Sequence, residues 1–444
     1  MLCLLKYRKE KPIYKFLQLK YYYNANIILT LIYSYAILKL EIHGNDVLDS
    51  KKRRKNTMRQ VYLDNAATSR PKPPAVWEAM ENYMKNIGCS PGRGGYECSL
   101  EAGRILLETR VLLKDFFNIP SPEQVIFTQN ITHSLNMALK GLLKKGDHVI
   151  TSSMEHNSVV RPLRNLEKTK GIEVDFVKCD EKGLLNPQLV KDKIKHNTKM
   201  IVLTHASNVT GTLMPVEEIG EIANEEGLLY VLDTAQTAGV YEIDFENLGL
   251  DVLAFTGHKS LMGPPGIGGL CISRRAAEQM EPLIEGGTGS RSDMEYQPDM
   301  LPDKFESGTM NTVGIAGLNA GLKFINKTGL QNIRNHEKQL TERFLEGLKK
   351  LPGIIVYGPG DPELQTSTIS ISIKGLDMGE LSFMLDYQYG VMTRSGLHCA
   401  PLAHKTIGSF PEGTLRFSIG YFNTTDEIDY TLRSLKEIID YNLS

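Results

Sequence analysis

The sequence predicts an α/β protein whose mostly parallel sheet is covered by helices on both faces. From residue 124 onward, short apolar runs alternate with stretches in which apolar residues recur at helical spacing. Most of the runs are apolar throughout, which is typical of strands that are buried on both faces of a parallel sheet. Apolar strands separated by helices indicate this layered architecture. Ligands of such sheets bind beyond the carboxyl ends of the strands, so we expect functional residues directly after each strand.

The predicted elements follow one another in a regular order along the chain. Strands are expected at Val125–Phe127, His148–Ile150, Val174–Val177, Met200–Leu203, Leu228–Leu232 and Val252–Phe255. Helices are expected between them at Thr132–Lys144, Val159–Lys168 and Val216–Asn224.

A smaller α+β domain is predicted for the last part of the chain. The run Thr366–Ile373 alternates apolar with small polar residues, as in a half-exposed antiparallel strand. Leu415–Ile419 predicts a further strand, and the apolar spacing within Glu427–Ile439 predicts a helix. We therefore expect a large domain over 58–317 and a small domain over 318–444. The first residues of the large domain can pack on the small one.

The composition excludes several classes of protein. The 444 residues are 41% hydrophobic and 23% charged, an ordinary globular mix that excludes a disordered or fibrous chain. Lys and Arg number 51 against 52 Asp and Glu, whereas general nucleic-acid binding needs a basic surface, so no nucleic-acid partner is expected. The six cysteines show no C-x-x-C spacing. Neither a disulfide framework nor a zinc site is therefore expected, and a reducing cytoplasm is the predicted location.

Residues 1–57 differ from the rest of the chain. They carry 12 Lys and Arg against 4 Asp and Glu, a net charge of +8 beside −9 for the remainder. The uncharged run 21–38 has the length of the shortest membrane-spanning helices, but the basic run 51–55 leaves its orientation open. Three interpretations remain: a membrane anchor, an amphipathic or disordered tail, and a segment outside the working protein, because Met58 could itself begin a complete domain. Every motif described below lies after residue 60, so we expect 1–57 to be dispensable for catalysis.

Polar residues follow two of the predicted strands. Asp233–Gln236 (DTAQ) comes directly after Leu228–Leu232. Thr256–Lys259 (TGHK) comes directly after Val252–Phe255.

An Asp and a Lys at adjacent strand ends could face one ligand. Pyridoxal phosphate requires such a pair, since a lysine amine binds it covalently and a carboxylate pairs with its pyridine nitrogen. A helix-capping Asp and a surface Lys are the common alternatives for each residue alone. The glycine run Gly263–Gly269 could be a tight turn.

Together with their neighbours, these segments resemble the class V aminotransferase family and, within it, the cysteine desulfurases. The resemblance covers about residues 60–440 and implies the aspartate aminotransferase-like fold of pyridoxal-phosphate-dependent transferases. Its motifs are Val61–Thr68 (VYLDNAAT), Ser207–Gly211 (SNVTG), Asp233–Gln236, Thr256–Lys259 with Gly263, Pro264 and Gly266, Arg394–Cys399 (RSGLHC) and Thr414–Arg416 (TLR). The short Arg394–Cys399 segment is similar to the group, shared with selenocysteine lyase, in which the reactive cysteine lies on a short loop.

The resemblance implies roles for residues around pyridoxal 5'-phosphate. Lys259 would bind the cofactor covalently and act in catalysis, and Asp233 would pair with its ring nitrogen. His156 would stack on the ring and is the third catalytic candidate, beside Lys259 and Cys399. The remaining cofactor-binding candidates are Gln236 and Asn208 at the ring hydroxyl, and Thr132, His133, Thr256, His258 and Thr309 at the phosphate. Of these, Thr132 opens a helix, where free backbone amides favour a phosphate, and Thr309 matches a phosphate contact that a partner subunit donates.

The resemblance also implies a substrate site and a reactive thiol. Arg416 would bind the substrate carboxylate in a two-pronged ion pair. The other implied substrate-binding residues are Asn208, Ala67 and Arg394. Cys399 distinguishes a desulfurase from an aminotransferase, and positive charge at His398 and Arg394 would favour its thiolate form. No metal site is expected, because Cys399 and His404 are only two possible ligands.

The implied function is that of a homodimeric cysteine desulfurase. Such an enzyme converts L-cysteine to L-alanine and leaves a persulfide on Cys399 for a sulfur-acceptor or scaffold protein, in iron–sulfur cluster assembly or other sulfur metabolism. The alternatives are a selenocysteine lyase, an aminotransferase or β-lyase with an idle Cys399, and a non-enzymatic sulfur carrier or membrane-docking protein. The family often has a second histidine where Asn157 and Leu397 stand here. The segments Ser90–Tyr96 and Ala400–His404 also depart from the family pattern, so substrate preference is left open.

Overall fold

The computed structural model describes residues 59–92, 94–291 and 293–443. The interpretations of residues 1–57, including the run 21–38, concern a segment outside these ranges. Among the residues that are described, no helix has both the length and the apolar character needed to cross a membrane.

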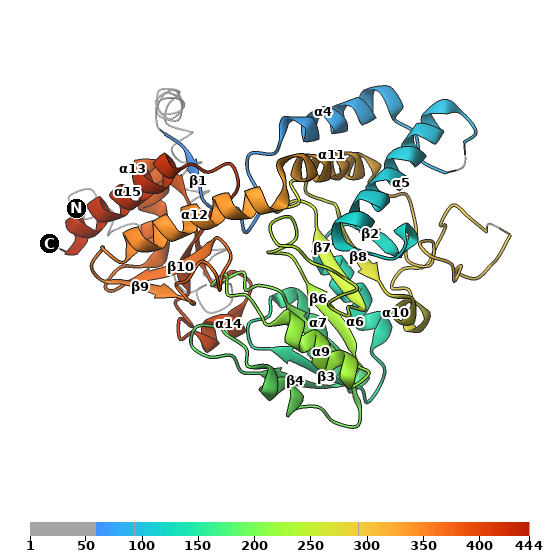
Figure 1. Ribbon diagram of the computed structural model, residues 1–444, viewed down its shortest axis with the longest axis horizontal. Coiled ribbons are helices and arrows are strands. Elements are labelled where there is room, and N and C mark those ends of the chain that lie inside the picture. Colours follow the sequence, from blue (N-terminus) through green and yellow to red (C-terminus); the bar gives the residue numbers. More distant parts are fainter. Residues whose placement is uncertain (1–58, 93, 292, 444) are drawn as a thin grey trace, which may run out of the picture. The chain divides into compact units, whose positions relative to one another are not determined.

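A seven-stranded sheet forms the centre of the large domain (Figure 1). Its strands, in spatial order, are β2 (Val125–Thr128), β8 (Gly268–Ile272), β7 (Val252–Thr256), β6 (Leu229–Asp233), β5 (Thr198–Thr204), β3 (His148–Ser152) and β4 (Glu173–Val177). Neighbouring strands are parallel except at β8, which runs antiparallel to both β2 and β7. The predicted mostly parallel sheet is therefore confirmed.

Strand β8 is an element that the sequence patterns did not predict. Its first residues belong to the glycine run, which resembles a turn. The glycines are needed because the neighbouring strands approach closely. A Cβ atom at Gly269 would lie 2.5 Å from the carbonyl oxygen of Ile126 on β2. Close backbone approach is a recognised role of glycine within strands.

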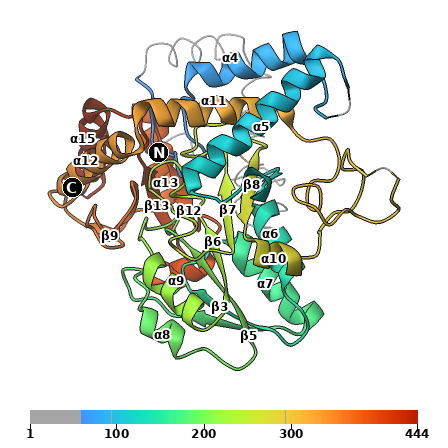
Figure 2. The same cartoon turned by 45° about the vertical axis from the view of Figure 1, so that its right-hand side comes forward.

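Helices cover both faces of this sheet (Figure 2). One face packs on α6 (Ile131–Leu142), α7 (Asn157–Lys170) and α10 (Arg274–Gln279), and the other on α5 (Glu97–Phe117), α9 (Val216–Glu225) and α11 (Thr312–Thr328). On β5, Met200 and Val202 enter the first core, whereas Ile201 and Leu203 enter the second. Successive side chains of a strand point to opposite faces, so a strand buried on both sides must be apolar throughout, as predicted.

Further helices precede the sheet or connect its strands. The π-helix η3 (Tyr83–Ile87) links α4 (Pro74–Asn82) to the region before α5, and α4 and α5 both pack on α11. The other short helices are η4 (Pro122–Gln124) and α8 (Pro187–Lys191). The residues from 74 to 117 lie outside the elements that the sequence predicted.

The small domain is built on a four-stranded antiparallel sheet. Its strands, in spatial order, are β12 (Arg394–Gly396), β13 (Thr414–Ser418), β10 (Thr368–Ile373) and β9 (Ile354–Tyr357). Its helices are α12 (Leu330–Leu348), α13 (Met378–Tyr389), α14 (Pro401–Thr406) and α15 (Thr425–Leu443). Near the start of the described chain, β1 (Val61–Tyr62) pairs in parallel with β11 (Val391–Met392). The boundary predicted after Gly317 falls within α11 and stays a prediction.

One expectation about the small domain is wrong. Strand β10 is antiparallel, as expected, but it is not half-exposed, because five of its six residues are buried. Its small polar residues face protein rather than water. The hydroxyl of Ser370, for example, donates a hydrogen bond of 2.6 Å to the carbonyl oxygen of Val209 in the large domain. Another of these residues, Ser372, lies with its hydroxyl 3.0 Å from the Tyr357 hydroxyl on β9, so the alternation of residue types reflects hydrogen bonding within the protein rather than solvent exposure.

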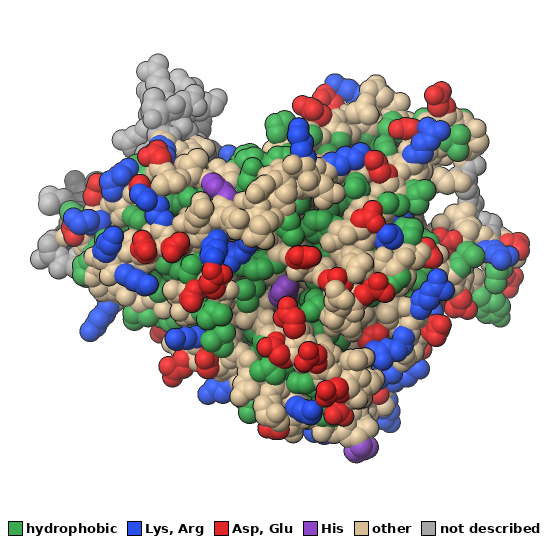
Figure 3. Space-filling view, viewed as in Figure 1, with side chains coloured by type: hydrophobic (Ala, Val, Ile, Leu, Met, Phe, Trp, Pro, Cys, Tyr) green, Lys and Arg blue, Asp and Glu red, His purple; other side chains and the backbone are tan. Residues whose placement is uncertain are grey.

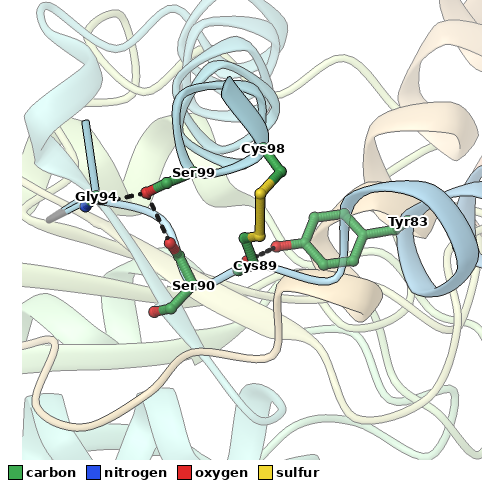
Figure 4. Close-up of a disulfide and its surroundings, with 6 residues drawn as sticks. All are labelled: Tyr83, Cys89, Ser90, Gly94, Cys98 and Ser99. Atoms are coloured by element: carbon green, nitrogen blue, oxygen red, sulfur yellow. Dashed lines mark hydrogen bonds between the residues drawn. A yellow bond between two sulfur atoms is a disulfide. The ribbon is translucent and has the colours of Figure 1, made fainter. Parts of the chain in front are cut away.

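A disulfide joins Cys89 to Cys98, contrary to the expectation from cysteine spacing (Figure 4). Cys89 follows η3, and Cys98 lies in the first turn of α5, so the chain reversal between two helices brings their Cα atoms to 5.8 Å. This separation is in the usual range for disulfides. The hydroxyl of Tyr83 donates to the carbonyl oxygen of Cys89 at 2.6 Å. A spacing of nine residues carries no motif, so only the folded chain reveals the pair.

Charged side chains of both signs are intermingled on the face shown in Figure 3. This distribution accords with the near-equal numbers of basic and acidic residues in the chain.

Candidate active site

Lys259 and Asp233 lie beyond adjacent strand ends. Strand β6 ends at Asp233, and its parallel neighbour β7 ends three residues before Lys259. Burial raises the pKa of Asp233, and the amide of Ala235 and the charge of Lys259 oppose this shift. Burial lowers the pKa of Lys259 to about 8, although the charge of Asp233 acts to raise this pKa. The predicted amine and carboxylate therefore interact electrostatically, and half of the amine is uncharged at about pH 8.

Unpaired polar atoms occur where the phosphate of the cofactor is predicted. Among the described residues, His133 Nε2, Thr256 Oγ1 and His258 Nδ1 are buried and have no hydrogen-bond partner. Helix α6, which begins at Ile131 and carries His133, packs against β7, which ends at Thr256. Buried polar groups nearly always have partners, so these three atoms indicate a polar ligand. The free amides at the start of α6 make the site suitable for an anion.

His156 is held as a neutral ring at the start of α7. It caps this helix, and its Nδ1 accepts a hydrogen bond of 3.0 Å from the amide of Ser158. Burial, reinforced by the charges of Lys259, Arg161 and Arg416, lowers the pKa of His156 to about 4. An uncharged imidazole with a fixed orientation suits the predicted stacking on an aromatic ring. His156, Thr132 and Cys399 line one cavity of about 400 Å³.

The two residues predicted at the ring hydroxyl, Gln236 and Asn208, are joined to neighbouring segments by hydrogen bonds. Gln236 Nε2 donates to the carbonyl oxygen of Ala66 at 3.3 Å, which places the segment containing Ala67 beside the end of β6. Asn208 Nδ2 donates to the carbonyl oxygen of His398 at 2.7 Å. The Oδ1 atom of Asn208 is buried and has no partner in the described part of the chain. Asn208 therefore connects the predicted cofactor site to the cysteine loop and keeps one acceptor free.

Arg416 and Arg394 are direct neighbours on adjacent antiparallel strands. The carboxylate of Asp64 lies between them, with Oδ1 at 2.7 Å from an Arg416 terminal nitrogen and Oδ2 at 3.1 Å from Arg394 Nε. A second terminal nitrogen of Arg416 donates to the carbonyl oxygen of Asn208 at 3.0 Å. Arg416 Nε is buried and has no partner among the described residues. The sequence patterns assigned no role to Asp64, although it lies within the motif Val61–Thr68.

The cysteine loop holds Cys399 in an unusual backbone conformation. His398 and Cys399 have φ angles of 47° and 58°, a region that residues other than glycine seldom adopt and that costs about 1–3 kcal/mol per residue. Hydrogen bonds fix the loop at both residues, since Asn157 N donates to Cys399 O at 2.8 Å and Asn208 binds His398 O. The Cys399 side chain is exposed, whereas the other two free cysteines in the described ranges are buried.

The expected electrostatic role of His398 is wrong. Burial, with the charge of Arg416, lowers the pKa of His398 well below its usual value, so the ring carries no positive charge at neutral pH. Its Nε2 lies 3.1 Å from Thr414 Oγ1, and its ring packs on His404 with 5.5 Å between ring centres. Arg416, in contrast, lies within the electrostatic reach of Cys399. Of these two residues, Arg416 rather than His398 carries a positive charge at neutral pH.

Thr309 stands apart from these groups. It is exposed, and it does not line the cavity that His156, Thr132 and Cys399 share. This position is compatible with the predicted contact across a subunit boundary. In the ranges that are described, no group of three or more His, Cys, Asp and Glu residues could hold a metal ion.

Comparison with known proteins identifies the family of the chain. Residues 61–431 match the model of the class V aminotransferases. The chain belongs to this family. A protein of Methanothermobacter thermautotrophicus named probable cysteine desulfurase is 38% identical over 383 residues, which cover 85% of this chain and 94% of the relative. A cysteine desulfurase of Haloferax volcanii is 32% identical, over 89% of this chain and 93% of the relative.

The solved structures of family members confirm the predicted fold. The apo structure of a cysteine desulfurase from Thermococcus onnurineus NA1 superposes with a TM-score of 0.81 at 34% identity, over 88% of this chain and 96% of that chain. The large, mostly parallel sheet with a smaller α+β domain is thus the fold of pyridoxal-phosphate-dependent transferases, as the motifs implied.

Proposed function

We propose that this class V family member is a pyridoxal-phosphate-dependent cysteine desulfurase, which converts L-cysteine to L-alanine and receives the sulfur on Cys399. The observation that carries the proposal is the position of Cys399. Its exposed thiol lies on a loop held by Asn157 and Asn208, and it lines one cavity with His156 and Thr132. The relatives named cysteine desulfurase, at 31–38% identity, support the same activity.

The residues present fit pyridoxal phosphate. Lys259 would bind it covalently, Asp233 would pair with the ring nitrogen, and His156 would stack on the ring. The unpartnered atoms of His133, Thr256 and His258, with Thr132 at the start of α6, would hold the phosphate. Gln236 and Asn208 would contact the ring hydroxyl. When bound, the cofactor supplies an electron-withdrawing ring that acidifies the α-hydrogen of the substrate and activates its Cβ–S bond.

The protein residues would then divide the reaction among them. Arg416 binds the substrate carboxylate, using the buried Nε that has no other partner in the described ranges. The Lys259 amine, once displaced by the substrate amine, removes the α-proton as a general base. The Cys399 thiolate attacks the substrate sulfur, so that an S–S bond forms as the Cβ–S bond breaks. The electron pair released to the substrate is protonated at Cβ, which gives L-alanine and a persulfide on Cys399.

An exposed persulfide is accessible to a second protein. We therefore propose that a sulfur-acceptor or scaffold protein takes the sulfur from Cys399, in iron–sulfur cluster assembly or other sulfur metabolism. This transfer distinguishes the proposed enzyme from an aminotransferase or β-lyase, in which Cys399 would have no function.

Product analysis with three substrates tests the proposed activity. The purified protein, loaded with pyridoxal phosphate, is incubated with L-cysteine, L-selenocysteine or L-cysteine sulfinate in the presence of a thiol reductant. We expect alanine and sulfide from L-cysteine in equal amounts. Turnover of L-selenocysteine without any product from L-cysteine would favour a selenocysteine lyase. Keto-acid formation without sulfide would favour an aminotransferase.

The low pKa of Lys259 predicts how cofactor binding depends on pH. Covalent binding requires the uncharged amine, and burial sets the pKa of this amine at about 8. The uncharged fraction rises as pH increases through this value, so the rate of cofactor capture by the apoprotein should rise between pH 7 and 9 and then level off. Stopped-flow absorbance with a fixed cofactor concentration measures the profile. A rate that keeps rising towards pH 10.5, the usual value for lysine, would contradict the lowered pKa.

We further propose that the protein is a homodimer. The helical segment α4–η3–α5 exposes five large hydrophobic side chains, each more than half exposed, namely Trp77, Met84, Tyr96, Leu100 and Leu107. Exposed apolar patches typically mark protein interfaces, so this segment is the candidate dimer contact. Thr309 is exposed on the same chain and would complete the phosphate site of a second subunit.

Oligomeric state is the measurement for this prediction. The wild-type protein should have the mass of a dimer by light scattering, and Leu100→Glu combined with Leu107→Glu should shift it to a monomer with weaker cofactor binding. Leu189→Glu, which alters an exposed leucine of α8, is the matched control and should leave the dimer intact. A wild-type monomer with full activity would refute the prediction.

A further inference from the structure

The neighbouring arginines of the candidate substrate site share one carboxylate. Arg394 on β12 and Arg416 on β13 are directly paired across the two strands. Like charges in such positions repel each other and destabilise the sheet. The carboxylate of Asp64 binds both guanidinium groups, at 3.1 Å and 2.7 Å, and offsets this repulsion.

The backbone around Asp64 is fixed to the strand that carries Arg416. Residue Asp64 forms an isolated β-bridge with Ser418, two positions beyond Arg416. On either side of Asp64, Ser418 N donates to Leu63 O at 2.8 Å, and Ala66 N donates to Ser418 Oγ at 2.9 Å. The carboxylate is therefore a built part of the site rather than a mobile surface group.

The three side chains differ in their access to solvent. The side chain of Arg416 is 3% exposed and that of Asp64 is 14% exposed, whereas that of Arg394 is 49% exposed. A buried guanidinium needs a partner, because an unpaired buried charge is strongly destabilising. Asp64 supplies it and leaves Arg416 Nε without a partner in the described residues, as a donor for the substrate.

The same groups act on the catalytic amine. Arg416 and Arg394 both lower the pKa of Lys259, and Asp64 raises it, after the larger effects of burial and Asp233. The cluster therefore lies within electrostatic reach of the Lys259 amine, which a substrate amine would displace. Its charge bears directly on the bound substrate.

We infer that Asp64 is a specificity-determining residue that leaves the pair Arg394–Arg416 with a single net positive charge, matched to an amino acid with one carboxylate and an uncharged side chain. The inference deepens the proposed function, on which it rests. Two guanidinium groups without Asp64 would carry two positive charges and would suit an amino acid with a second acidic group. With Asp64 in place, the α-carboxylate alone balances the cluster, and a second negative charge on the substrate is repelled by Asp64.

An isosteric pair of sulfur-free ligands tests this inference. L-asparagine and L-aspartate have nearly the same shape and differ by one negative charge, and neither can be desulfurated. Their dissociation constants are measured for the holoenzyme by calorimetry. The wild type should bind asparagine more tightly than aspartate. In Asp64→Asn, the dissociation constant of aspartate relative to that of asparagine should fall by about tenfold or more. This is the effect of one unit charge at ion-pair distance in a partly exposed site.

Two further variants make the result specific. Arg394→Gln removes one positive charge from the cluster and should shift the ratio in the opposite direction, which keeps the inference testable if Asp64→Asn fails to fold. Asp429→Asn removes an equal charge from an exposed ion pair with Arg343, between α12 and α15, and should leave the ratio unchanged. A merely structural role for Asp64 would weaken both ligands alike.

The outcomes separate the inference from the proposed activity. The inference is overturned if the ratio of the two dissociation constants is the same in Asp64→Asn as in the wild type, because Asp64 then does not set specificity. Because neither ligand contains sulfur, a shifted ratio supports the inference even if the protein releases no sulfide from L-cysteine. Failure of the desulfurase proposal would instead appear in the product analysis of the wild type.

Discussion

Replacement of Lys259 with alanine is expected to abolish both covalent cofactor binding and turnover. In the proposed function, this side chain would supply the amine that binds pyridoxal phosphate and, after displacement, the base that removes the α-proton. Loss of a positioned general base alone costs about 10²–10⁴-fold in rate, and loss of the covalent attachment adds to this. The measurements are the visible absorbance of the purified protein with added cofactor and the rate of alanine formation from L-cysteine.

An exposed lysine provides the control for this experiment. Lys195 forms surface ion pairs with Glu173 and Asp175, and Lys195→Ala should keep the cofactor spectrum and the rate of the wild type. If Lys259→Ala also kept them, the amine at the end of β7 would not be the attachment site, and the proposed chemistry would fail at its first step.

Replacement of Cys399 with serine should leave cofactor binding intact and eliminate persulfide formation. A serine hydroxyl is a far weaker nucleophile than a thiolate and cannot accept sulfur from the substrate. We expect sulfide release from L-cysteine to fall by at least about 100-fold, while the visible spectrum with cofactor and its change on addition of L-cysteine persist. Sulfide release and absorbance are measured on the same preparation.

A buried cysteine is the matched control for Cys399. Cys179 is buried, and burial raises the pKa of its thiol to about 12, so it stays protonated and unreactive at neutral pH. Cys179→Ala should therefore release sulfide at the wild-type rate wherever it folds. Unchanged sulfide release by Cys399→Ser would assign the cysteine loop a structural role only.

Six of the seven strands of the large sheet, and three of the helices between them, were predictable because their apolar residues follow simple periods. Strand β5 is apolar on both faces, since Met200 and Ile201 enter different cores, and such runs are readily recognised in a sequence. Strand β8 was not recognisable, because the glycine that allows close contact with β2 at Ile126 resembles a turn residue. The exposure of β10 was predicted wrongly because Ser370 is satisfied by a distant backbone carbonyl rather than by water.

The candidate site was predictable to the extent that it follows strands and motifs. The rule that ligands lie beyond strand ends placed Asp233 and Lys259 together, and the structure agrees. Interactions between distant segments were not predictable in this way. Asp64 lies 330 residues before Arg394 in the chain, and its ion pairs appear only when β12 and β13 pack on the start of the large domain. The neutral state of His398 likewise depends on burial, which residue type does not reveal.

The proposed transfer of sulfur from L-cysteine to Cys399 can be tested by measuring the mass of the peptide that contains Cys399. The holoenzyme is incubated with L-cysteine without reductant or acceptor, digested, and analysed by mass spectrometry alongside the amount of alanine formed. We expect the Cys399 peptide to gain the mass of one sulfur atom in proportion to the alanine released, while peptides with Cys179 and Cys271 do not. Formation of alanine with an unmodified Cys399 peptide, or with the added sulfur on another cysteine, would contradict this proposal.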